Sequence, residues 1–147
     1  MMTTTKSGID AGSAARLQLT VMRLARRLRQ QAPEGVTPSQ LSALSTLYVR
    51  GPLTLGELAE AERVRPPTMT RIVAGLEEAG LLERERDEKD RRCARVVVTR
   101  AGRTFVERSR TRKTAYLVGR LKKLSQEEVA TLKRATEILE KVVEEEV

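Results

Sequence analysis

Residues 57–102 read ELAEAERVRPPTMTRIVAGLEEAGLLERERDEKDRRCARVVVTRAG. Just before this stretch, Thr54 and Glu57 form a capping box, which predicts a short helix over residues 55–62. After a turn over residues 63–65 come Pro66 and Pro67, and prolines are favoured in the first turn of a helix. We therefore expect a second helix from residue 66 to 79, which stops at Gly80.

Two runs with a period of two residues follow this helix, at 82–86 and 93–99, and residues 87–91 join them. In the first run Leu82, Arg84 and Arg86 alternate with Glu83 and Glu85, and in the second Ala94, Val96 and Val98 form one of the two faces. Such runs predict a β-hairpin. A short helix, a three-residue turn, a second helix and a hairpin together indicate a winged helix-turn-helix.

Helices are expected on both sides of this stretch. Residues 11–31 carry an apolar stripe with helical spacing, and Pro38 follows the N-cap Thr37 of a helix that ends near Gly51. A helix over 99–124 and a last helix that opens with Ser125 complete the chain. The apolar stripes of the terminal helices are Leu17, Val21, Leu24 and Leu28 at one end, and Val129, Leu132, Ala135, Leu139 and Val142 at the other.

The predicted fold is mainly α with a small β-hairpin wing, a winged helix-turn-helix with N- and C-terminal dimerisation helices. We expect a disordered tail over 1–10, dimerisation helices over 11–36 and 100–147, and the winged lobe over 37–99. The terminal stripes exceed what one small lobe can cover, which favours a homodimer. The alternative is that they pack within one chain.

The composition excludes most enzyme classes. The chain has no histidine and one cysteine, Cys93, so it lacks the usual general base and the usual metal ligand, and we expect no cofactor. A single cysteine indicates a reducing compartment, and we expect a cytoplasmic protein. No apolar run is long enough to span a membrane.

The net charge is +8, which suggests a polyanionic partner. The excess lies at the two ends of the chain, because residues 51–100 carry ten basic and ten acidic side chains. If residues 51–100 bind DNA, the directions in which their arginines point must produce this binding, because the net charge of the segment is zero.

A helical wheel over residues 68–78 separates two faces. Met69, Val73 and Leu76 fall on a core face, and Thr70 and Arg71 lie opposite. Arginine suits a guanine edge, and threonine suits a polar edge or a thymine methyl. The alternative for Arg71 is a surface salt bridge, and the threonines can be plain surface residues.

The hairpin carries nearly balanced charges, among them Lys89, Arg91 and Arg92. One interpretation is that carboxylates at the tip hold selected arginines extended, so that one enters a minor groove. The alternative is a self-neutralised, solvated hairpin.

From Glu57 to Gly102 the sequence resembles the MarR family of bacterial regulators, above all at Arg65–Arg71 and at Val98-Thr99 with Ala101-Gly102. The resemblance covers nearly the whole chain after residue 10. It implies a homodimer joined by the first and last helices, which binds double-stranded DNA at a palindromic operator. It also implies a repressor that a small aromatic or phenolic effector releases.

By position, the resemblance implies DNA contacts from the recognition helix and from the wing. The recognition-helix residues are Arg65, Pro67, Thr68, Thr70 and Arg71, and the wing residues are Lys89, Arg91 and Arg92. Lys89 replaces the family's middle wing arginine, so either Arg91 or Arg92 can be the minor-groove residue. Arg63 replaces the usual turn glycine and is expected to adopt a positive φ.

The resemblance also implies an effector crevice between the dimerisation helices and the DNA-binding lobe. Met22 and Tyr48 are the candidate lining residues, and either can instead be a plain core residue. Cys93 lies in the wing and is expected to have no sensing role. A winged-helix module that binds only proteins, and not DNA, is the alternative function.

Overall fold

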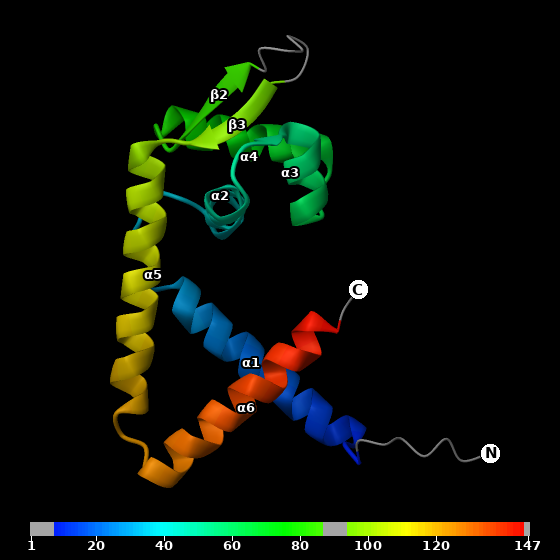
Figure 1. Cartoon of the computed structure of the whole chain (residues 1–147), viewed down its shortest axis with the longest axis vertical. Helices are drawn as coiled ribbons and strands as arrows, with labels where there is room; N and C mark the ends of the chain where they lie inside the picture. Colours follow the sequence, from blue (N-terminus) through cyan, green and yellow to red (C-terminus); the bar gives the residue numbers. More distant parts are fainter. Residues whose placement is uncertain (1–7, 87–93, 146–147) are drawn as a thin grey trace, which may run out of the picture. The chain divides into compact units, whose positions relative to one another are not determined.

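The computed structural model describes residues 8–86 and 94–145. Its helices are α1 (Ala11–Arg29), α2 (Pro38–Arg50), α3 (Leu55–Glu62), α4 (Pro66–Glu78), α5 (Arg100–Leu121) and α6 (Gln126–Glu144). Its strands are β1 (Leu53–Thr54), β2 (Leu82–Arg86) and β3 (Ala94–Val98) (Figure 1). The predicted fold class, a mainly helical winged helix-turn-helix, is confirmed.

The helix starts lie where the capping residues predict them. Thr37, Thr54 and Ser125 each accept a hydrogen bond from a backbone N–H of the first turn, and the Gln or Glu side chain three residues later accepts one from the cap's own N–H. Asp10 caps α1 by accepting from the Ser13 N–H at 2.6 Å. Each cap satisfies N–H groups that have no partner within the helix, so local sequence alone sets these boundaries.

The wing contains a third strand that the hairpin prediction lacked. The sheet order is β1-β3-β2, and both strand pairs are antiparallel. In the register of β1 with β3, Leu53 lies opposite Val96 and Thr54 opposite Arg95. A two-residue strand is too short to show an alternating pattern, so only its pairing with β3 reveals it.

The core of the winged lobe lies where α2, α3 and α4 meet one another and the sheet (Figure 1). The fully buried side chains there are Leu44, Leu47, Leu58, Met69, Val73, Leu76, Val96 and Val106. Because Met69, Val73 and Leu76 all come from α4, this helix is held in the core by one face. Its opposite face is left to solvent.

The described chain divides into two units, one up to Lys113 and one from Thr114. Neither α1 nor α6 contains a buried residue. In the single chain Leu24 of α1 is 42% exposed and Val142 of α6 is 60% exposed, although both lie on the predicted apolar stripes.

Candidate nucleic-acid interface

The turn between α3 and α4 is tight although it contains no glycine. Arg63 has φ of 53°, in the left-handed region, as its place in the turn predicts. Its N–H donates to the Glu60 carbonyl at 3.1 Å, and the Val64 N–H donates to the Ala59 carbonyl at 3.0 Å. This pair of bonds is a Schellman motif, in which glycine is the usual left-handed residue. Val64 packs against the core and closes the turn.

The start of α4 is set by backbone restriction and not by a capping side chain. Arg65 is extended (φ −69°, ψ 146°) and makes no side-chain cap hydrogen bond. A residue before proline is disfavoured from the helical region, which explains this conformation. Pro66 and Pro67 then occupy the first two helical positions, where a missing N–H costs little.

The outward face of α4 carries the residues predicted to contact DNA. Arg65, Pro67, Thr70 and Arg71 are exposed, and Thr68 is half-buried. Among the described residues Arg71 makes no salt bridge, so the alternative of a surface ion pair is not observed there. The face therefore presents a hydroxyl, a pyrrolidine ring and a guanidinium group that pairs with none of the described carboxylates.

An ion pair connects the end of α4 to the wing. Arg84 Nε in β2 donates to Glu77 Oε1 at 2.8 Å, and both side chains are partly exposed. In the register of the wing strands, Glu85 lies opposite Arg95. The wing predictions Lys89, Arg91 and Arg92, together with Cys93, lie outside the described residues.

One threonine joins the end of α4, the base of the wing and the start of α5. The Thr99 hydroxyl donates to the Gly80 carbonyl at 2.7 Å and accepts from the Gly102 N–H at 3.1 Å. The Thr99 N–H also donates to the Leu81 carbonyl at 3.1 Å. A Cβ on Gly102 would overlap the Leu81 carbonyl oxygen and lie 2.8 Å from Val98 Cγ1. Close packing therefore explains why a glycine stands here.

Two contacts that support this interface could not be seen in the sequence. Glu62, the last residue of α3, accepts hydrogen bonds from Ser42 (2.8 Å) and Thr46 (2.6 Å) of α2. These hydroxyls lie 20 and 16 residues before it in the chain. No periodicity or motif links residues at such separations. The same holds for the Glu77–Arg84 pair, which joins a helix to a strand.

Comparisons with known proteins agree with this geometry. The MarR family model matches residues 36–94. A helix-turn-helix transcriptional regulator of Mycobacterium leprae is 42% identical over 137 residues, with 92% of this chain and 96% of that protein covered. The chain belongs to the MarR family. It is thus a DNA-binding transcriptional regulator and not an enzyme.

Solved structures share the MarR fold with this chain. A MarR family protein from Bacillus stearothermophilus has a TM-score of 0.77 and 27% identity, and the match covers 93% of this chain and 99% of that one. A mutant of Staphylococcus aureus MepR, solved bound to an oligodeoxyribonucleotide, has a TM-score of 0.70 at 22% identity. Here the match covers 88% of this chain and 97% of that one, and shows the fold alone.

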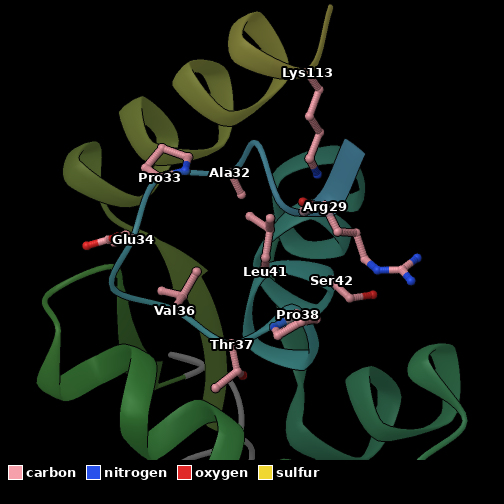
Figure 2. A pocket seen from close by; sticks show the side chains of 11 residues that line it. Arg29, Ala32, Pro33, Glu34, Val36, Thr37, Pro38, Leu41, Ser42 and Lys113 are labelled. Carbon is pink, nitrogen blue, oxygen red and sulfur yellow. The ribbon is translucent and has the colours of Figure 1, made fainter. Parts of the chain in front are cut away.

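The MarR-family chain also has a hollow of about 430 Å³, which no residue of α4 lines (Figure 2). Its wall is partly apolar, with Pro33, Val36 and Leu41, and it contains two cations, Arg29 and Lys113. Figure 2 shows the Glu34 carboxylate turned away from Lys113. Burial lowers the pKa of Lys113 below its usual value, and the positive charges of Arg29 and Arg110 lower it further. The hollow thus holds positive charge with no described carboxylate paired to it.

The two predicted effector residues do not line this hollow. Met22 is 58% exposed on α1. Tyr48 donates its hydroxyl hydrogen to Glu107 Oε1 at 3.0 Å, and its ring lies 4.8 Å from the Arg110 guanidinium carbon. Tyr48 therefore joins α2 to α5.

None of the described helices is long and apolar enough to cross a membrane.

Proposed function

We propose that this protein is a homodimeric repressor that reads a palindromic operator with α4 and the wing. We further propose that binding of a small aromatic acid releases it. The observation that carries the reading role is the outward face of α4, where Arg71 is exposed and free of described ion pairs while the opposite face is locked in the core.

The proposed base contacts come from Arg65, Pro67, Thr68, Thr70 and Arg71. An arginine can donate two parallel hydrogen bonds to guanine O6 and N7, which is the commonest specific contact in a major groove. In the wing we assign backbone or minor-groove contacts to Lys89, Arg91 and Arg92, since long cationic side chains suit a narrow, electronegative groove.

The exposed stripes of α1 and α6 support the homodimer. Most of their members remain exposed, and exposed apolar patches mark an interaction surface. The exposed members are Leu17, Val21, Leu24, Leu132, Leu139 and Val142. A two-fold dimer then requires an inverted repeat, with half-sites about 10 bp apart. The repressor role is supported by the repressor MdtR of Bacillus subtilis, which is 32% identical over 102 residues, or 69% of this chain and 66% of that protein.

The hollow between Arg29 and Lys113 supports an anionic aromatic effector. Its volume is within the usual range for small-molecule sites, and apolar walls with few polar groups are typical of them. A carboxylate there would relieve the repulsion between the two cations. The effector weakens DNA binding only if it has different affinities for the DNA-competent and incompetent forms.

The test is selection of a duplex from a random pool by the wild-type protein. Affinities for the selected and a scrambled duplex are then measured across a salt series. We expect Arg71→Ala to reduce the ratio of the two affinities by roughly 5- to 150-fold per half-site, because a bidentate guanine contact is worth about 1–3 kcal/mol.

Replacing both Arg91 and Arg92 by alanine should instead weaken both duplexes more evenly. It should also reduce the salt dependence, by about 0.9 in slope for each phosphate that the variant no longer neutralises. Arg108→Ala, an exposed arginine of α5, is the matched control. An unchanged affinity ratio in Arg71→Ala would show that α4 does not read the bases as proposed.

A further inference from the structure

The first turn of α4 offers very few hydrogen-bond donors. Pro66 and Pro67 have no N–H, and the Met69 N–H already donates to the Arg65 carbonyl at 3.1 Å. At most the Thr68 N–H is left from this turn. A helix N-terminus usually attracts phosphate through such free N–H groups. Here the end of the helix presents pyrrolidine CH₂ groups instead.

The Thr70 hydroxyl already uses its hydrogen within the helix. Its Oγ1 lies 3.0 Å from the Pro66 carbonyl oxygen, four residues earlier, and donates its only hydrogen there. A hydroxyl has one hydrogen and two lone pairs, so the exposed Thr70 oxygen can only accept a further hydrogen bond. The same side chain also carries a methyl group. Thr70 can therefore accept a hydrogen bond from a base amino group, whereas donating to a base acceptor would break the bond to Pro66.

Three chemically distinct side chains, Pro67, Thr70 and Arg71, are thus exposed on α4. Pro67 and Thr70 are three residues apart in the helix, so they occupy neighbouring surface positions, where the proline ring and the threonine methyl can share one thymine methyl. The Thr70 oxygen adds an acceptor, and Arg71, the next residue, adds a fork of donors. In a major groove, an A·T pair presents the thymine methyl and the adenine N6 amino group together. A C·G pair has an amino group but no methyl.

From this arrangement we infer that Pro67 and Thr70 together select an A·T pair, next to a guanine selected by Arg71. The thymine methyl lies against the Pro67 ring and the Thr70 methyl, and adenine N6 donates to Thr70 Oγ1. The inference rests on the proposed role of α4 as the reading helix. It adds the identity of the base pair, and it makes Thr70 a determinant of specificity through acceptance alone.

The experiment begins with the duplex selected by the wild-type protein. Each thymine is replaced in turn by uracil, which lacks the methyl. Each adenine is replaced in turn by 2-aminopurine, which still pairs with thymine but has no amino group in the major groove. We expect one position per half-site, beside a G·C pair, to respond to both changes. Loss of the methyl should cost about fourfold in affinity and loss of the amino group about fivefold.

Two variants of Thr70 separate the two contacts. Thr70→Val keeps the methyl shape but has no oxygen, so it should still distinguish thymine from uracil and no longer distinguish adenine from 2-aminopurine. Thr70→Ser keeps the oxygen and loses the methyl. It should therefore still distinguish adenine from 2-aminopurine and distinguish thymine from uracil less well. The matched control is the same pair of changes at Thr111 of α5, which is exposed and bonds to the Glu107 carbonyl at the same 3.0 Å.

The possible failures can be told apart. If the wild-type protein selects no sequence, the proposed function itself fails. If it selects a sequence in which no A·T pair responds to both base analogues, or if Thr70→Val keeps its preference for adenine over 2-aminopurine, the proposed function stands and this inference is overturned.

Discussion

At the scale of single residues, Arg63 shows how an unfavourable backbone conformation is tolerated. A non-glycine residue in the left-handed region costs about 1–2 kcal/mol. Both bonds of the Schellman motif and the packing of Val64 against the core offset this cost. These hydrogen bonds and this packing therefore hold the turn between α3 and α4, although the backbone conformation is unfavourable for Arg63 itself.

Lys113 is the residue whose charge state the fold disfavours. Its pKa is lowered mainly by burial and then by the charges of Arg29 and Arg110. The unfolded chain therefore binds this proton more tightly, and stability rises with pH from the folded pKa up to the usual value of 10.5. Below that window the charged lysine costs stability, which an anion bound in the hollow would relieve.

We therefore expect Lys113→Gln to raise the melting temperature slightly at pH 7 and to weaken binding of a small aromatic acid about tenfold, since one charge-assisted hydrogen bond is removed. Calorimetric titration of salicylate, as the probe, and thermal unfolding check both parts. Arg112→Gln, at the exposed neighbouring position outside the hollow, is the control. Equal salicylate affinities in the two variants would contradict the proposed effector site.

At the scale of elements, α4 is held at both ends by its neighbours. Glu62 fixes the end of α3 to α2, so the turn into α4 has a defined origin. At the other end, Thr99 bonds to the Gly80 carbonyl while it caps α5. Thr99 therefore connects the start of α5 to Gly80, which follows α4, through hydrogen bonds of 2.7 Å and 3.1 Å.

This junction predicts opposite effects for two glycines of α5. Gly102→Ala should destabilise the protein by about 1–3 kcal/mol, because its Cβ would overlap the Leu81 carbonyl and backbone cannot move freely there. Gly119→Ala, in the same helix, has open space around the new Cβ and should stabilise it by about 0.5–1 kcal/mol through helix propensity. Urea unfolding of both variants measures the difference. A Gly102→Ala protein as stable as wild type would show that the close approach is not a constraint.

At the scale of the whole molecule, the basic charge lies outside the reading element. The chain has a net charge of +8, yet residues 51–100 are balanced. The charge excess can therefore raise the rate of encounter with DNA without contributing to base recognition. In the proposed complex, base recognition depends on how the arginines are displayed, and the proposed inverted repeat depends on the pairing of two chains.

The proposed dimer predicts that Leu24→Glu in α1 dissociates the protein, because a charge would enter an apolar interface. Val49→Glu, on the 69% exposed Val49 of α2, should leave the assembly unchanged. Sedimentation velocity at micromolar concentration distinguishes the two species. A wild-type protein that sediments as a folded monomer would refute the homodimer.

Much of the fold and of the candidate interface could be predicted from local sequence. The capping boxes at Thr37, Thr54 and Ser125 and the prolines of α4 set helix boundaries, because each acts on backbone groups within one turn. The helical period likewise separated the buried Met69 from the exposed Arg71, since spacing on one helix needs no other element.

Only the tertiary structure decided the features that join distant segments. It placed β1 beside β3, and Gly102 against the Leu81 carbonyl. It also brought Tyr48 into contact with Glu107 and Arg110, and it paired Glu77 with Arg84. It also brought Arg29 and Lys113, which are far apart in the sequence, to one hollow. The physical reason is that each of these contacts depends on the relative position of two elements, which packing of the whole core determines, whereas a capping residue or a helical stripe depends on neighbours a few residues away.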